Sequence, residues 1–202
     1  MIYEHEKKER ANNGEVTYLP MPAPRPDISP MMLAYLHDRE LSYQLARGNG
    51  WYPTLSKGAR IVIPCVNSIG FHYWQARSMV NDPLRYDSPP IPRRDSIVML
   101  WPQKQNPNAL HTVVITEGPM KSLAAAEFYP SIATMGAAPS EEVLEHIKRK
   151  IIALGLTDVW IVPDLDAPEF IDNFRELNPK IVMPTCKDLD QMPRWEREKL
   201  LG

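Results

Sequence analysis

The stretch HTVVITEGPMKSLAAAEF, residues 111–128, constrains the fold more than any other part of this chain. Its β-branched run from Thr112 to Thr116 predicts a buried strand, and the alanine-rich segment from Lys121 to Phe128 predicts a helix. Glu117 and Gly118 stand between them, at the strand end where α/β folds place their ligands. Glycine allows a turn or a close backbone approach at such a point. The stretch therefore predicts a strand–turn–helix unit that presents a carboxylate.

A second unit of the same kind lies further along the chain. The apolar run from Val159 to Val162 leads into Asp164 and Asp166. Together with Glu117, these strand ends offer three carboxylates, and carboxylate oxygens are the ligands that divalent cations use in phosphate chemistry. Taken alone, an Asp-Leu-Asp sequence after a strand is more often a turn or a helix N-cap. Together with Glu117, the two aspartates are the raw material for a metal site, which is the alternative to a turn or a cap.

Strands and helices alternate over residues 107–202, which favours an α/β domain with parallel crossovers. The predicted strands cover residues 112–116, 132–135, 158–162 and 180–183, and the predicted helices cover residues 120–128, 140–153, 168–177 and 193–200. Small residues around Gly136, at the end of the second strand, would let the chain pass close to the carboxylates.

The first half of the chain is rich in proline and predicts two segments. Residues 1–28 read as a flexible arm, and residues 29–106 as a small mixed α+β subdomain. Ser29 is the expected N-cap of the first helix. Three expected strands, the first two joined by a hairpin turn, cover residues 59–65, 71–77 and 96–101.

Basic side chains stand among aromatic ones in this subdomain. The basic residues are Arg60, Arg77, Arg85, Arg93, Arg94 and Lys104. Such a mixture is typical of a surface that binds single-stranded nucleic acid or nucleotides. The ordinary alternative, which composition alone favours, is a small aromatic core with arginines on its rim.

Composition excludes several classes of protein. A chain of 202 residues with 44% hydrophobic residues can bury a core, and its net charge of −2 leaves room only for a local basic surface. Two cysteines without partners at ligand spacing argue against structural zinc and fit a reducing cytoplasm. The charged N-terminus does not resemble a secretory signal, and no apolar run reaches membrane-span length. We therefore expect a cytoplasmic protein without a membrane partner.

Four segments resemble, in chain order, the motifs of the Toprim fold, which bacterial-type primases, topoisomerases and some nucleases share. They are TEGPMKSLAAA, TMGAAPS, IVPDLDAPEF and PTCKDLDQM. Upstream, the segment GNGWYPTLSKGARIVIPCVNSIGFHYWQARSM resembles the basic subdomain of DnaG-type primases, with Arg60 and Arg77 at family positions. PLRYDSPP resembles a further primase segment, with Arg85 in place of a lysine. The resemblance implies an α/β Toprim domain, a parallel sheet flanked by helices, over residues 107–202 behind the basic primase subdomain.

The resemblance also implies an activity, which is the synthesis of short RNA primers on a single-stranded DNA template for DNA replication. Glu117, Asp164 and Asp166 would be catalytic and would hold Mg²⁺ or Mn²⁺ for two-metal nucleotidyl transfer, with Glu117 as a ligand or as the general base. Asp188 would be a further metal ligand and Asp190 an outer candidate. The residues expected to bind NTPs or template are Arg60, Arg77, Arg85, Lys121, Gly118, Gly136 and Lys187.

The compact form of the chain resembles a phage protein more than a cellular replicative primase. Three departures from the family pattern also bear on this reading. The chain has no counterpart of the primase zinc-binding domain, so either a partner supplies template selection or recognition works differently, and we expect a replicative helicase or another replisome protein as a partner. Primases commonly carry aspartate at the position of Lys121, which here either contacts a phosphate or pairs within the acidic cluster. No P-loop is present, so motor activity is not expected.

Two other functions could use the same residues. The first is a Toprim nuclease, against which the upstream basic subdomain argues. The second is a non-catalytic subunit that binds nucleic acid or a replisome protein, with Lys121 disabling the metal site.

Overall fold

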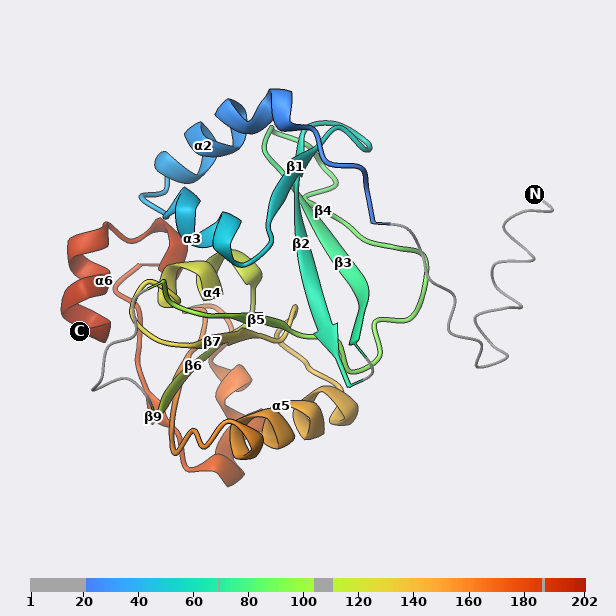
Figure 1. Ribbon diagram of the computed structural model, residues 1–202. Helices are drawn as coiled ribbons and strands as arrows, with labels where there is room; N and C mark the ends of the chain where they lie inside the picture. Colours follow the sequence, from blue (N-terminus) through green and yellow to red (C-terminus); the bar gives the residue numbers. More distant parts are fainter. Residues whose placement is uncertain (1–20, 69, 104–110, 187) are drawn as a thin grey trace.

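Two sheets of different kinds organise the chain in this computed structural model, which describes residues 21–68, 70–103, 111–186 and 188–202 (Figure 1). The first sheet is antiparallel, in the order β1-β2-β3-β4. Its strands are β1 (Tyr52–Thr54), β2 (Arg60–Asn67), β3 (Gly70–Ser78) and β4 (Tyr86–Asp87). The helical segments that precede it are η1 (Pro26–Ile28), α2 (Ser29–His37) and α3 (Tyr43–Gly48).

The second sheet has the order β5-β7-β6-β8-β9. Its strands are β5 (Val98–Leu100), β6 (Thr112–Thr116), β7 (Ser131–Ala133), β8 (Asp158–Val162) and β9 (Lys180–Ile181). The helical segments that follow the strands are α4 (Pro119–Ala125), α5 (Glu141–Ala153), η3 (Pro168–Leu177), η4 (Leu189–Gln191) and α6 (Arg194–Leu201). β5 pairs antiparallel with β7, and the other neighbouring strands are parallel. The predicted α/β sheet with parallel crossovers is thereby confirmed.

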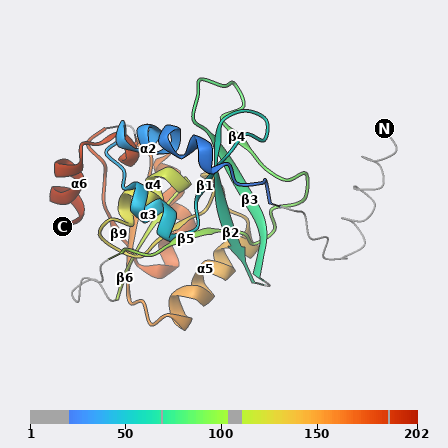
Figure 2. The ribbon, with the colours of Figure 1, turned by 45° about the horizontal axis from the view of Figure 1, so that its top comes forward.

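Strand β6 lies at the centre of the second sheet because it is apolar on both faces. All five of its residues are buried. Val114 packs into a hydrophobic cluster with α4, while Val113 and Ile115 pack into a second cluster with α5 and η3. Figures 1 and 2 agree that α5 covers one face of the sheet and that α4 covers the other, beneath α2 and α3. A continuous β-branched run is what a strand covered on both faces requires.

One hydrophobic core joins the two sheets. Met32 of α2 and Trp51, which precedes β1, belong to the same buried cluster as Leu123 of α4 and Leu201 of α6. The sheets are also linked directly, because the backbone groups of Val66 and Ile97 form an isolated antiparallel bridge. This shared core holds the ends of the parallel strands at a fixed position against the antiparallel sheet.

Several predicted elements occur where the sequence placed them, and others differ. β6 and β8 match the predicted strands at 112–116 and 158–162, and β2 and β3 form the predicted hairpin. The predicted N-cap at Ser29 is wrong: Ser29 is the first residue of α2 and Ile28 is its N-cap, because the turn η1 leads directly into the helix. The predicted helix at 168–177 is a 3-10 helix. β5, which the sequence grouped with the first subdomain, is the edge strand of the second sheet.

Part of the predicted N-terminal arm lies outside the described residues, and the rest runs beside β1. The hydroxyls of Tyr52 and Thr54 donate to the backbone carbonyls of Pro22 and Ala23 at 2.9 Å each. The Arg25 amide donates to the Pro53 carbonyl at 2.8 Å. Residues 22–25 therefore hydrogen-bond to the edge of the first sheet.

None of the helices in the described part of the chain combines the length and apolar character needed to cross a bilayer.

Candidate active-site cleft

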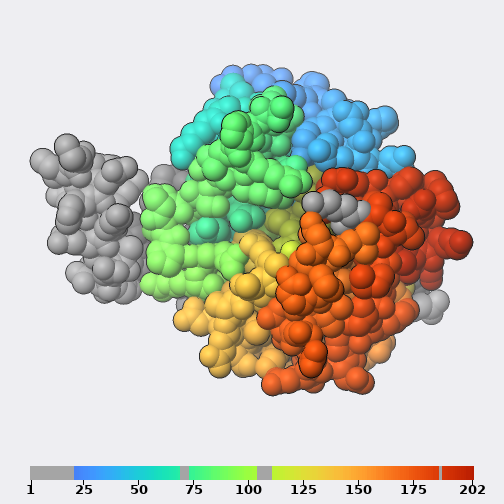
Figure 3. Space-filling model, turned by 180° about the vertical axis from the view of Figure 1, so that it is seen from behind, coloured from blue at the N-terminus to red at the C-terminus, as the bar shows by residue number. Residues whose placement is uncertain are grey.

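A polar cleft lies where the two sheets meet, with a volume of about 320 Å³. Its lining comes from β3 and the β4 region on one side and from the ends of β6, β7 and β8 with η4 on the other. The residues that line it are Gln75, Arg77, Arg85, Tyr86, Glu117, Gly118, Pro119, Met120, Lys121, Met135, Gly136, Asp164, Asp166, Asp188 and Asp190. On the face shown in Figure 3, the green residues of the segment that follows β3 lie next to the orange residues of the second half of the chain, with yellow-green residues visible between them.

The cleft gathers nearly all the residues that the sequence singled out. The carboxylates at positions 117, 164, 166, 188 and 190 line it together, as do Arg77, Arg85 and Lys121. Arg60 is not part of its lining, and Lys187 lies outside the described residues. Five carboxylates beside three basic groups in one cavity form a site for a cation and an anion together, which is the charge pattern of a metal–phosphate complex.

Glu117 is presented at the end of β6, and the turn after it is open. Gly118, the N-cap of α4, has φ −119° and ψ 150°, an extended conformation that any residue adopts. Among the described residues, nothing lies within 4 Å of a Cβ added there. The expectation that this turn needs a glycine is therefore not met. The missing side chain instead leaves free space at the wall of the cleft.

Glu117 is 9% exposed, and its carboxyl group is held against the end of β8. Its Oε1 accepts a hydrogen bond from the amide of Asp164 at 3.3 Å. Burial and the nearby charge of Asp164 raise the pKa of Glu117, although this amide bond and Lys121 oppose the shift. A carboxyl group with a raised pKa is a better proton acceptor than an ordinary glutamate.

Lys121 was predicted either to contact a phosphate or to pair within the acidic cluster, and the structure places it inside the cluster. From the first turns of α4, its ammonium contacts Asp164 Oδ2, and it lies 3.1 Å from Asp188 Oδ1. Burial lowers the pKa of Lys121, but its bonds to the two aspartates outweigh that effect and the pKa lies above the usual value. Lys121 is therefore a cation shared by two carboxylates.

Asp164 has one oxygen paired and one unpaired. Its Oδ1 is buried and has no hydrogen-bond partner within the described part of the chain. Burial raises the pKa of Asp164, and the charges of Asp188 and Asp166 add to the shift against the opposing effect of Lys121. A buried carboxylate oxygen without a donor is costly unless a further donor or a cation satisfies it.

Asp188 and Asp190 extend the acidic cluster through η4. Asp188 Oδ2 accepts a hydrogen bond from Gln191 Nε2 at 2.8 Å. Asp190 is 4% exposed, and its Oδ2 lies 4.0 Å from Arg39 Nε. Burial raises the pKa of Asp190, and the charge of Asp188 raises it further.

The opposite wall of the cleft presents Arg77 on an aromatic support. Its Nε donates to the hydroxyl of Tyr35 at 2.8 Å, and its guanidinium lies 5.0 Å from the centroid of the Tyr86 ring. The guanidinium of Arg39 lies in turn over the Tyr35 ring at 4.0 Å. Because Tyr35 and Tyr86 fix the plane of the Arg77 guanidinium, they prepare it for a directed contact with phosphate.

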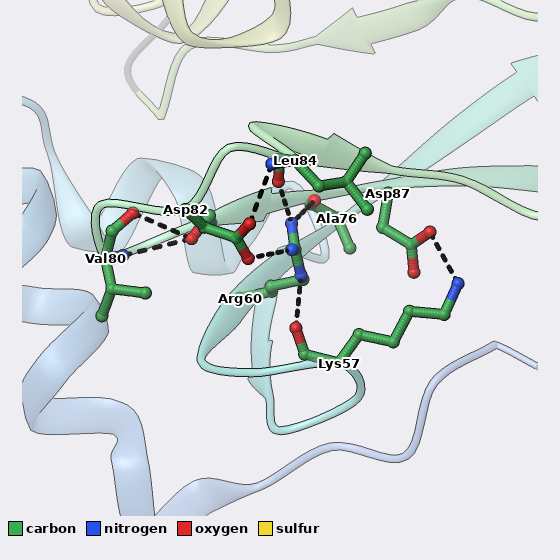
Figure 4. Close-up of polar contacts among 8 residues, drawn as sticks. Lys57, Arg60, Ala76, Val80, Asp82, Leu84 and Asp87 are labelled. Carbon is green, nitrogen blue, oxygen red and sulfur yellow. Dashed lines mark hydrogen bonds and ion pairs between the residues drawn. The ribbon is translucent and has the colours of Figure 1, made fainter.

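Arg60 instead holds the first sheet together (Figure 4). Its side chain is 1% exposed and donates to the carbonyls of Lys57, Ala76 and Leu84 at 2.9 to 3.3 Å. The same guanidinium pairs with Asp82 at 2.5 Å. With its donors engaged in this way and its side chain outside the lining of the cleft, Arg60 is not placed for a contact with phosphate there, and its predicted binding role finds no support in its position.

A strained turn at the end of β7 completes the wall. Met135 has φ 61°, and Gly136 has φ 153°, a region that favours glycine. The Gly136 amide donates to the Glu117 carbonyl at 3.0 Å, and Arg93 Nη1 donates to the Met135 carbonyl at 2.5 Å. The turn is thus fastened to the end of β6, so that its strained backbone stands directly beside Glu117.

Sequence reasoning missed several residues of the site. Gln75 lies two residues before Arg77 on β3, and the alternation of a strand places both on one face, but only Arg77 was predicted to bind nucleotide or template. Tyr86 belongs to the mixture of basic and aromatic residues already noted. Tyr35 and Arg93 act from α2 and from a loop, and no local pattern connects them to the cleft.

The carboxylates of the cleft fit a divalent cation whose coordination shell is completed by a substrate, but they do not surround the ion on all sides. Within the described residues, no three His, Cys, Asp or Glu side chains stand close enough together to hold an ion. Mg²⁺ commonly binds through one or two carboxylates together with water and substrate phosphates. Asp164 Oδ1, which is buried and without a hydrogen-bond partner among the described residues, is an oxygen that such an ion would satisfy, and Glu117 and Asp166 line the same cleft.

Comparison with known proteins connects this arrangement to a fold. No protein-family model matches the chain, and no curated protein sequence does. Solved structures do match. A DnaG primase catalytic domain bound to ssDNA superposes with a TM-score of 0.62 at 15% identity, covering 98% of this chain and 78% of that one. The E. coli primase catalytic core gives 0.60 at 14% identity, with coverage of 87% and 72%.

A DNA primase domain from Pseudomonas aeruginosa matches with a TM-score of 0.57 at 17% identity, covering 94% of this chain and 73% of that one. At these identities the likeness establishes the fold. The predicted fold class, an α/β domain with a parallel-containing sheet behind a small mixed α+β subdomain, is thereby confirmed: the chain has the fold of DnaG primase catalytic cores.

Proposed function

We propose that this protein is a DNA primase, a nucleotidyltransferase that synthesises short RNA primers on single-stranded DNA for replication. The observation that carries the proposal is the cleft itself, where five carboxylates from the ends of β6 and β8 and from η4 share one cavity with Arg77 of β3 and Arg85 next to β4. The solved structure of a DnaG primase catalytic domain with this fold was obtained bound to ssDNA, which supports single-stranded DNA as the template.

The acidic side of the cleft would hold the metal. Glu117, Asp164 and Asp166 are the residues that would bind Mg²⁺ or Mn²⁺, and Asp188, whose Oδ1 lies 3.1 Å from the Lys121 ammonium, would be a further ligand. When bound, such an ion supplies Lewis-acid stabilisation of charge on a triphosphate and lowers the pKa of an attacking hydroxyl. The raised pKa of Glu117 also suits this side chain to accept the proton of that hydroxyl.

The basic side of the cleft would bind the phosphates. Arg77 is preorganised by Tyr35 and Tyr86, and Arg85 is exposed on the same wall. A guanidinium presents paired donors that match two phosphate oxygens. We assign the two arginines to the triphosphate of an incoming NTP or to template phosphates, and we propose a replicative helicase or another replisome protein as the further partner.

The test is the incorporation of labelled NTPs on a mixed single-stranded DNA template, with Mg²⁺ or with Mn²⁺, by wild type and by Asp164→Asn. Short RNA products from wild type alone would support the primase and its metal site together. Degraded template would point to a Toprim nuclease. If neither product forms, even with a cognate helicase present, the remaining function is that of a non-catalytic binding subunit. The ion pairs of Lys121 specifically favour this alternative.

A further inference from the structure

Lys121 occupies the point at which a cation is needed between two carboxylates. Its ammonium contacts Asp164 Oδ2 and lies 3.1 Å from Asp188 Oδ1. The three side chains are only 12%, 14% and 8% exposed, so this is a largely buried ion triad rather than a surface salt bridge. Charges of this kind are costly to leave unpaired, so the triad is part of the folded structure.

A divalent ion cannot bridge the same two oxygens while the ammonium is there. Mg²⁺ stands about 2.0–2.1 Å from each of its oxygen ligands. An ion bridging Asp164 and Asp188 would therefore stand between the two oxygens that Lys121 contacts, within the space of its ammonium. The two positive charges would also repel each other strongly in a cleft of reduced solvent access.

The other carboxylate oxygen of Asp164 takes no part in this pairing. Asp164 Oδ1 is buried and has no hydrogen-bond partner among the described residues, so a cation would satisfy it. Glu117 lies nearby, because its Oε1 accepts a hydrogen bond from the Asp164 amide. The acidic cluster thus has one part that a lysine neutralises and one part where a carboxylate oxygen still lacks a partner.

We propose that Lys121 is a built-in monovalent cation that takes the place of one divalent ion between Asp164 and Asp188. The cleft then binds one divalent ion fewer than its carboxylates could hold. This inference deepens the proposed function, on which its relevance to nucleotidyl transfer rests. It concerns metal binding, which is measurable whether or not the protein makes primers.

The experiment is a titration of the full chain with Mn²⁺, without DNA or nucleotide, in which free Mn²⁺ is counted by electron paramagnetic resonance. Lys121→Gln should bind one more Mn²⁺ per chain than wild type, with an affinity at the gained position at least about tenfold above any wild-type binding there. Lys121→Arg, which keeps the charge, should behave as wild type.

Lys148→Gln is the matched control. The Lys148 ammonium also lies between two carboxylates, at 3.2 Å from Glu145 and 2.7 Å from Glu176, but on the exposed surface. This variant should bind Mn²⁺ as wild type does.

Removal of Lys121 leaves two buried carboxylates unpaired, so Lys121→Gln could unfold in the absence of metal. Mn²⁺ should then restore its structure and raise its Tm more than that of wild type, because a ligand that binds the folded state stabilises it. Equal Mn²⁺ number, affinity and Mn²⁺-dependent Tm in wild type and Lys121→Gln would overturn the proposal. An absence of primer synthesis would not, so the two proposals fail separately.

Discussion

The two sheets contribute to the cleft according to different rules. In the parallel sheet, a residue reaches the cleft if it follows the end of a strand. The reason is that the carboxyl ends of parallel strands meet at one edge of the sheet, and this edge faces the cleft. Glu117 and Asp164 follow adjacent, paired strands in this way. In the antiparallel sheet, a residue reaches the cleft only if its side chain is on the face of the strand that is turned toward it. Neighbouring residues of a strand have their side chains on opposite faces.

Arg60 and Arg77 show the second rule. Arg60 pairs with Ser78, and Arg77 pairs with Ile61. Since paired residues point to the same side of an antiparallel sheet, the two arginines point to opposite sides. Arg77 reaches the cleft, whereas Arg60 is enclosed by the loop that carries Asp82. Two arginines that look equivalent in the sequence therefore have different expected functions, one in binding and one in stability.

The largest expected effect is on the acidic edge. Asp166→Asn and Glu117→Gln should each abolish primer synthesis, a loss of about 10³-fold or more, because each removes a carboxylate that would hold the metal ion, and the ion would stabilise the negative charge of the transition state. Circular dichroism should show an unchanged fold. Asp172→Asn, which alters an exposed carboxylate of the same region, serves as the control and should retain full activity. A normal primer yield from either variant would refute the assignment of that carboxylate to the active site.

Arg60→Ala should act on stability. The substitution removes a buried guanidinium that serves three carbonyls and Asp82, and it should lower the free energy of unfolding by about 3 kcal/mol or more. Urea denaturation measures this directly. Arg175→Ala, at an exposed ion pair, should change it by less than about 0.5 kcal/mol. Unchanged stability together with lost NTP binding would mean that the two arginines share one role.

Arg77→Ala should act on binding. We expect roughly tenfold weaker binding of NTP or single-stranded DNA, with the slope of log K against log salt reduced by about one, as for the loss of one phosphate contact. The loss is then largest at low salt. Fluorescence anisotropy across a salt series measures both quantities, and Arg175→Ala again provides the control. An affinity and a salt slope equal to those of wild type would remove Arg77 from the site.

The smallest effect concerns the pH dependence of stability. Because burial and the charge of Asp188 raise the pKa of Asp190, the folded protein takes up a proton at this group more readily than the unfolded chain does. Stability contributed here is therefore lost as pH rises from the usual aspartate range through the raised pKa. Asp190→Asn should raise the free energy of unfolding at neutral pH and flatten its pH dependence. Reduced stability at neutral pH would show instead that the pairing with Arg39 dominates.

Much of the fold was predictable because the local signals agree with it. β6 and β8 are continuous apolar runs, and α5 has acidic residues in its first turn and Lys150 in its last. The assignment of β5 to the second sheet was not predictable, since a short edge strand carries no mark of its partner. The first residue of α2 was not predictable either, because it depends on the turn η1, and the proline-rich sequence before the helix does not indicate that such a turn forms.

The acidic half of the candidate site was readable from the strand ends, but its internal pairing was not. Lys121 and Asp188 are far apart in the chain, so no local sequence pattern predicts that their side chains form an ion pair. The burial of Arg60 depends on the loop at residues 82–84, which the sequence marks only as irregular. Side chains that act across the shared core, such as Tyr35 on Arg77, become visible only when the sheets are docked.

The most direct test of the account is a crystal structure of the protein with Mn²⁺ and a nucleoside triphosphate. We predict anomalous scattering from Mn²⁺ beside Asp164 and Glu117, and a triphosphate bound to Arg77 and Arg85 across the cleft. A nucleotide and a metal bound elsewhere would contradict the claim that the two sheets form one active site.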